Sequence, residues 1–195
     1  MKKKGMRNFA TLTIAILCLS LAACATAPVT PSEKAEQMDS LRAMANQTLA
    51  QLDKTNPAAK RAISNAAGYA VFSDFGFKLS FMGGAKGKGV AINNTTKKET
   101  FMKMMEFQPG LGLGAEKFRL VLVFENSAAF NTFVTSGWEA GANAMLAAKS
   151  KTAGGGLAGA VSVSEGVYMY QVTEEGLIVG VSITGAKYFK DKDLE

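Results

Sequence analysis

The chain has 195 residues, enough for one domain with a short appendage, and it carries a formal net charge of +6, two cysteines and no histidine. The lack of histidine excludes Ser-His-Asp and Cys-His catalytic systems and histidine-ligated metal sites. The positive charge would favour a nucleic-acid-binding protein only if it belonged to the folded part of the chain.

Residues 1–23 have the pattern of a bacterial signal peptide. Four cations within the first seven residues precede an apolar run at 9–21, which is too short to span a bilayer. The run ends in Leu21-Ala22-Ala23-Cys24, which resembles the lipobox of bacterial lipoproteins. This resemblance implies that residues 1–23 are removed and that Cys24 receives fatty acyl chains such as palmitate. An ordinary signal peptide with a chance cysteine is the alternative.

The residue after Cys24 predicts the location of the protein. In lipoprotein sorting an aspartate at this position retains the protein at the inner membrane, whereas this chain has Ala25. We therefore expect a lipid anchor in the outer membrane, on the periplasmic side, joined to the domain by a tether over residues 24–31. Two or three acyl chains anchor a protein stably without a transmembrane helix.

Removal of the signal peptide changes the charge and the cysteine count. Four of the 22 cations lie before Cys24, which leaves 18 against 16 acidic residues, an excess of two. Binding to nucleic acid thereby loses its main support. Cys18 is discarded and Cys24 carries lipid, so we expect neither a disulfide nor a free thiol in the mature chain.

The mature chain begins with two predicted helices. Thr30 and Glu33 form a capping-box pattern, and Asn56-Pro57 marks the start of a second helix that Gly68 is expected to end. Apolar residues at three- and four-residue spacing predict that the first helix, over 32–54, is amphipathic. They are Met38, Leu41, Ala45, Leu49 and Leu52. We expect this apolar face to dock on the domain; a helix lying on the membrane surface is the alternative.

From Tyr69 the apolar period changes from 3.6 to 2, which predicts strands. The contiguous apolar residues within 117–125 indicate a strand buried on both faces. The glycine-rich segment Gly83–Gly89 is expected to be a flexible connection, and 127–135 a short helix. Helix propensity favours a helix over 138–151. The predicted strands are 69–72, 75–81, 90–92, 99–107, 117–125, 167–173 and 177–184.

One stretch of the mature chain is strongly cationic. Six lysines between Lys78 and Lys103 oppose a single carboxylate, Glu99, which gives a local charge of +5. Such a surface suits anionic phospholipid headgroups, although solvated loop lysines are the alternative. The candidate lipid-binding residues are Lys78, Lys86, Lys88, Lys97, Lys98 and Lys103.

Three sequence blocks in a fixed order resemble the SYLF lipid-binding domain family, which includes the yeast Ysc-type actin-patch proteins. The blocks are Gly68–Val90 with its glycine-lysine repeat, Pro109–Phe124, and Gly176–Gly185. The resemblance implies a compact α+β domain over 32–195, with N-terminal amphipathic helices packed on a curved, mainly antiparallel sheet. It also implies that 138–151 is strand rather than helix, that bacterial members are exported lipoproteins, and that affinity for anionic phospholipid carries over.

The sequence therefore predicts a protein that binds rather than catalyses. An enzyme without histidine or free cysteine would depend on carboxylates, a Ser/Lys system or a carboxylate-bound metal. We expect no cofactor, no metal and no nucleic-acid partner. The expected partners are the membrane, through Cys24, and anionic phospholipid. A structural or protein-interaction role in the cell envelope, with no specific lipid ligand, is the alternative.

Overall fold

A computed structural model describes residues 30–141, 157–173, 176–178 and 185–195. The chain divides into two units, Met1–Glu33 and Lys34–Glu195. The predicted signal peptide, Cys24 and most of the tether lie outside the described residues. So do residues 142–151 of the element predicted at 138–151 and residues 179–184 of the strand predicted at 177–184. None of the described helices is long and apolar enough to cross a membrane.

The first helix, α2 (Pro31–Thr55), begins as the sequence predicts. The backbone N–H of Thr30 donates to Glu33 Oε2 at 2.7 Å, and the N–H of Glu33 donates to Thr30 Oγ1 at 3.3 Å. This reciprocal pair is the predicted capping box. The next helix, α3 (Pro57–Asn65), starts at an Asn56 cap, as expected.

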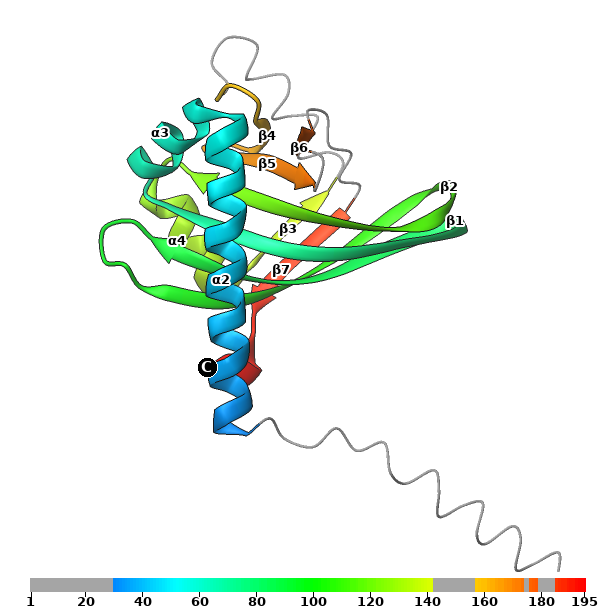
Figure 1. Ribbon diagram of the computed structural model, residues 1–195, viewed down its shortest axis with the longest axis horizontal. Coiled ribbons are helices and arrows are strands. Elements are labelled where there is room, and N and C mark those ends of the chain that lie inside the picture. Colours follow the sequence, from blue (N-terminus) through cyan, green and yellow to red (C-terminus); the bar gives the residue numbers. More distant parts are fainter. Residues whose placement is uncertain (1–29, 142–156, 174–175, 179–184) are drawn as a thin grey trace, which may run out of the picture. The chain divides into compact units, whose positions relative to one another are not determined.

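Two long strands, β1 (Gly68–Asn93) and β2 (Glu99–Phe124), form an antiparallel ribbon that bends back on itself. The N–H of Asn94, just beyond the end of β1, donates to the carbonyl of Ala67, just before its start, at 3.0 Å. The two halves of β1 therefore lie side by side near the ends of the ribbon. The ribbon's bend lies at the right of Figure 1.

The remaining strands extend this ribbon into one curled antiparallel sheet. The first half of β2 pairs with β7 (Gly185–Lys190), which in turn pairs with β3 (Trp138–Gly141). The second half of β2 pairs with β5 (Val167–Thr173), which is flanked by β4 (Val161–Ser164) and β6 (Gly176–Ile178). The described strands thus form a seven-stranded sheet, and the predicted α+β class is confirmed.

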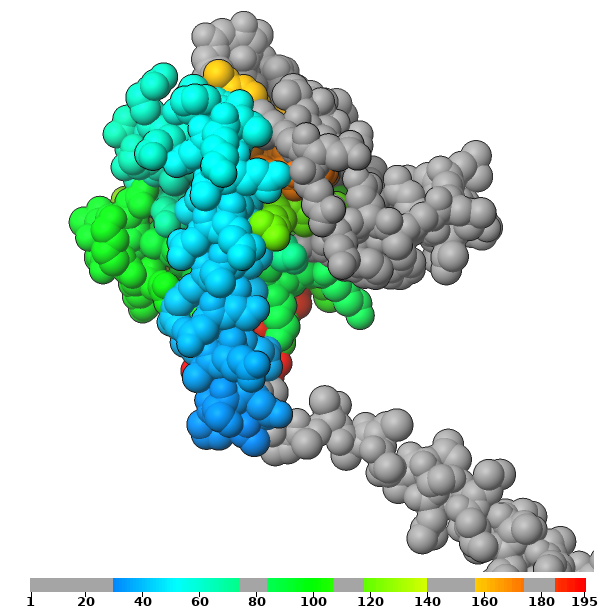
Figure 2. All heavy atoms as spheres, in the orientation of Figure 1, coloured from blue at the N-terminus to red at the C-terminus, as the bar shows by residue number. Residues whose placement is uncertain are grey.

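Each face of the sheet is covered by helices and carries its own core. On one face, Leu41, Ala45 and Leu52 of α2 and Ile63 of α3 pack with sheet residues such as Val121. On the other face, α4 (Ser127–Ser136) contributes Phe130 and Phe133 to an aromatic cluster. Figure 1 shows α2 and α4 on the sheet, and α2 runs along the surface in Figure 2, blue to cyan. The prediction that α2 docks on the domain is confirmed.

Because both faces are covered, the apolar run of β2 is buried on both sides. Leu120, Leu122 and Phe124 face the α4 side, whereas Val121 and Val123 face α2 and α3, and all five are at most 1% exposed. This alternation confirms the doubly buried strand predicted at 117–125.

Two glycine predictions were wrong. Gly83–Gly89 is not a connection but part of β1, because its backbone pairs with β2. Gly68 does not end α3; it is the first residue of β1, and a Cβ there would lie 2.4 Å from Phe130 Cδ2. Gly68 therefore serves close packing against Phe130 rather than a helix end.

At 138–141 the family resemblance was right and helix propensity was wrong. Gly137, with a φ of 75°, ends α4, and Trp138 begins β3. The indole stacks on Tyr188, with ring centroids 5.7 Å apart. Pairing with β7 and partial burial of this ring override the local preference for helix.

Candidate functional site

A cavity of about 670 Å³ opens beside α2, near the place where the two halves of the ribbon diverge. All of its described lining residues are cationic, polar or apolar, and none is acidic. They are Gln51, Ser73, Lys86, Gly87, Lys88, Lys103, Met104, Met105, Phe118, Arg119, Val172, Thr173 and Phe189. A cavity of this size is in the range of small-molecule sites, about 300–1,000 Å³.

Strand register explains why these side chains meet. Lys88 lies opposite Lys103, and Lys86 lies opposite Met105, in the first half of the ribbon. In the second half, Arg119 lies between Ser73 of β1 and Val172 of β5. Directly opposed residues have their side chains on the same face of the sheet. The opposed residues of each half of the ribbon therefore line the same side of the cavity.

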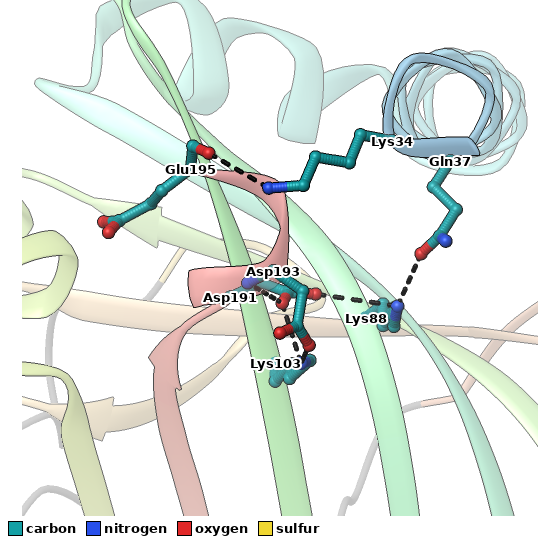
Figure 3. Close-up of polar contacts among 7 residues, drawn as sticks. All are labelled: Lys34, Gln37, Lys88, Lys103, Asp191, Asp193 and Glu195. Carbon is teal, nitrogen blue, oxygen red and sulfur yellow. Dashed lines mark hydrogen bonds and ion pairs between the residues drawn. The ribbon is translucent and has the colours of Figure 1, made fainter. Parts of the chain in front are cut away.

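Lys103 is held by the segment that follows β7. Its ammonium group lies 2.7 Å from Asp191 Oδ1 and 2.5 Å from Asp193 Oδ2 (Figure 3). The Asp191 side chain is fully buried. Burial lowers the pKa of Lys103, but the hydrogen bonds to Asp191 and Asp193 outweigh that effect and leave this pKa above its usual value. The hydrogen bond from Lys103 also lowers the pKa of Asp193.

Lys88 is shared between the same segment and α2. Its ammonium group lies 2.8 Å from Gln37 Oε1 and 3.6 Å from Asp191 Oδ2, as Figure 3 shows. Asp191 also caps the short 3₁₀ turn η2 (Lys192–Leu194) by accepting the N–H of Asp193 at 3.1 Å. The segment after β7 thus neutralises two of the cations at the cavity.

The other two cations of the cavity, Lys86 and Arg119, differ from Lys88 and Lys103 in their partners. Among the residues that the structure describes, Lys86 and Arg119 form no ion pair with a carboxylate. Arg119 donates from Nη1 to Thr48 Oγ1 at 3.3 Å, a hydrogen bond that positions its guanidinium against α2. Lys86 is exposed. Among the described residues, these are the two cations of the cavity that pair with no carboxylate.

The six predicted lysines do not all reach this site. Lys86, Lys88 and Lys103 line the cavity, whereas Lys97 and Lys98 lie in the turn between β1 and β2 and do not. The backbone of Lys78 pairs with Gly114, and its side chain lies outside the described ones. A single face built from all six lysines is thus not what the described residues form.

Arg119 was missed in the sequence analysis. It lies inside the apolar run of β2, between Phe118 and Leu120. A cation within a strand predicted to be buried on both faces is itself a signal, because a buried charge needs a partner or an opening to solvent. Here the cavity supplies that opening.

Comparison with known proteins gives two matches. Residues 105–195 match the Ysc84 family, described as "Las17-binding protein actin regulator". The chain is also 35% identical over 164 residues to Beta cell expansion factor A of Aeromonas veronii. That match covers 84% of this chain and 61% of the relative, so the chain spans less than two thirds of the relative's length. Of the cavity residues, the Ysc84 match includes Met105 and Arg119 but not Lys86 or Lys88.

Proposed function

The chain belongs to the SYLF family through its Ysc84 region at residues 105–195, and from this premise we propose that it is a non-enzymatic envelope lipoprotein that binds anionic phospholipid. In this proposal Cys24 carries the lipid anchor, the protein faces the periplasm from the outer membrane, and the domain contacts phospholipid headgroups through the cations beside α2.

The observation that carries the proposal is the charge of the cavity. Four cations and no carboxylate are found among its described lining residues. Each cation near an anionic membrane surface contributes about 1 kcal/mol to binding. Lys88 and Lys103 already form ion pairs with Asp191 and Asp193. We therefore propose Lys86 and Arg119 as the residues that contact the headgroup.

Vesicle co-sedimentation tests this proposal. The chain without its predicted signal peptide, residues 24–195 with Cys24→Ser to remove the acyl anchor, is mixed with vesicles of phosphatidylglycerol or of phosphatidylcholine. We expect binding to phosphatidylglycerol and little binding to phosphatidylcholine. Loss of two cations at about 1 kcal/mol each weakens binding about 30-fold, so Lys86→Gln with Arg119→Gln should weaken it by at least that factor.

The matched control is the double variant Lys97→Gln with Lys98→Gln, which removes the same charge from the turn outside the cavity. We expect it to retain most of the binding. Equal losses in the two double variants would show a general charge effect and contradict the proposed site. No binding to phosphatidylglycerol by the parent chain would contradict the function.

A structural or protein-interaction role in the envelope remains the alternative function. The apolar face of α2 is already packed on the sheet, so this helix offers no free apolar stripe to a partner. Crosslinking in intact envelopes, performed beside the vesicle assay, distinguishes the two: a specific protein adduct without phospholipid binding would favour the alternative.

A further inference from the structure

We propose that the cavity beside α2 binds a single-chain anionic amphiphile, such as a fatty acid or a lysophospholipid, with its head at Lys86 and Arg119 and its chain inside. This inference rests on the proposed affinity for anionic lipid and adds that one lipid molecule leaves the bilayer plane to enter the protein. The ligand would then occupy the cavity, in contrast to electrostatic binding at the membrane surface.

The apolar part of the site comes from three strands. Met105 of β2, Phe189 of β7 and Val172 of β5 line the cavity. Val172 is fully buried, whereas Met105 is 48% exposed and is the one large apolar side chain among the described residues that stands out as exposed. A methionine adapts its shape to a flexible chain more readily than a branched side chain does.

The cations flank this apolar wall. Lys86 lies directly across the ribbon from Met105, and Arg119 lies directly beside Val172. A ligand that contacts both cations therefore brings whatever is attached to its head against apolar side chains. A bare anion would leave these side chains in water, whereas an acyl chain would bury them, and each buried CH₂ contributes about 0.8 kcal/mol.

The arrangement selects the charge and the size of the ligand. None of the described lining residues is acidic, so an anionic head meets no carboxylate among them. A planar guanidinium binds carboxylate or phosphate oxygens in a bidentate manner, so both head types suit Arg119. A volume of about 670 Å³ accommodates one acyl chain and its head rather than the two chains of a diacyl phospholipid.

Titration calorimetry with monomeric ligands tests the inference. Residues 24–195 with Cys24→Ser are titrated, below the critical micelle concentration, with dodecanoate, with lysophosphatidylglycerol, with zwitterionic lysophosphatidylcholine and with inorganic phosphate. We expect saturable binding of one molecule of dodecanoate or lysophosphatidylglycerol per chain. Lysophosphatidylcholine should bind at least about 10-fold more weakly, because its choline cation offsets the charge of its phosphate. Phosphate alone should show no detectable binding, because it has no acyl chain to bury the apolar side chains. The dodecanoate and lysophosphatidylglycerol arms distinguish a carboxylate head from a phosphate head.

Two variants assign the contacts. Lys86→Gln with Arg119→Gln should weaken dodecanoate binding at least about 10-fold, and Met105→Gln should weaken it while phosphatidylglycerol vesicles still bind. The double variant Lys97→Gln with Lys98→Gln should bind as the parent does. Circular dichroism confirms that each variant is folded.

The outcomes separate this inference from the proposed function. Binding to vesicles without saturable binding of either monomeric anion overturns the ligand site and leaves the membrane function standing. Binding of the monomers without binding to vesicles supports the site and contradicts the membrane function. Equal affinity for phosphate alone, or no effect of the Lys86 and Arg119 substitutions, overturns the site.

Discussion

Lys103 lies at the cavity, but two carboxylates hold its ammonium group, and this makes it a structural residue. Asp191 is fully buried and lies 2.7 Å from this ammonium group. Removing one member of a buried pair leaves the other charge uncompensated, which costs about 3–5 kcal/mol in fully buried cases. Lys88 lies 3.6 Å from the same carboxylate and offsets part of that cost.

We therefore expect Lys103→Ala to lower the free energy of unfolding by about 2 kcal/mol, measured by urea denaturation. Lys98→Ala, which removes an exposed lysine in the turn between β1 and β2, is the control and should change this free energy by less than about 0.5 kcal/mol. Similar values for the two variants would mean that the contacts with Asp191 and Asp193 do not stabilise the fold.

The pKa of Asp193 gives the same cluster a dependence on pH. The hydrogen bond from Lys103 lowers this pKa from 3.8 in the folded state. A carboxylate with a lowered folded-state pKa stabilises the fold above its unfolded-state pKa, and this contribution is lost as the pH falls through the folded-state value.

We expect Asp193→Asn to be less stable than the parent at pH 7, because the charged pair is lost. The difference should disappear when the pH falls below the lowered pKa, since Asp193 is then protonated in both states of the parent. Urea denaturation at pH 7 and at a pH below the lowered pKa of Asp193 measures this difference in stability. Glu36→Gln, which removes an exposed carboxylate, is the control. A difference that stays constant with pH would argue against the pair.

At the scale of single residues, the sequence predicted part of the cavity site. The lysine-rich stretch 78–103 contains three cavity lysines, Lys86, Lys88 and Lys103, because alternation along β1 and β2 places them on one face. The sequence could not separate Lys86 from Lys88 and Lys103, since the partner carboxylates Asp191 and Asp193 lie far away in the chain. It also could not place Arg119 beside them, because that contact depends on the bend of the ribbon.

At the scale of elements, the bend of the β1–β2 ribbon is the central feature. A Cβ on Gly89 would lie 2.3 Å from the carbonyl oxygen of Val71 and 2.5 Å from Phe72 Cδ1. The two halves of β1 approach this closely only because glycine has no side chain. Glycines that local patterns assign to a loop are thus required inside a strand.

Gly89→Ala should therefore lower the free energy of unfolding by at least about 2 kcal/mol, because a backbone oxygen cannot move away as a flexible side chain can. Gly185→Ala is the matched control: a Cβ there meets no atom of the described residues within 4 Å, and we expect a change below about 1 kcal/mol. Denaturant midpoints measure both. Equal tolerance at the two positions would contradict the close approach.

The sequence predicted the helices better than the sheet for a physical reason. Caps and amphipathic spacing are local, so α2, α3 and α4 begin close to where the sequence places them. The continuity of β1 through Gly83–Gly89 depends on pairing with β2, and β3 depends on pairing with β7. Such pairings join residues far apart in the chain and override local preference.

At the scale of the whole molecule, the anchor and the domain have separate tasks in our proposal. We expect Cys24→Ser to abolish incorporation of radiolabelled palmitate and to release the protein from the membrane fraction, because the acyl chains supply the stable attachment. Cys18→Ser, in the apolar run that is predicted to be removed, should change neither result. Palmitate incorporation that persists in Cys24→Ser would contradict the predicted lipobox.

The pairing of β2 also determines the order in which the protein can fold. The ribbon of β1 and β2 closes through a short local turn, so it can form early, as contacts between near neighbours do. The edge of β2 at residues 102–106 can pair only after β7 has been synthesised, and β7 follows α4 and every other described strand. In our proposal the chain is exported before it folds, so that edge has no partner during synthesis and transport, and an open strand edge invites aggregation. We therefore expect the exported chain to depend on a chaperone most during this interval.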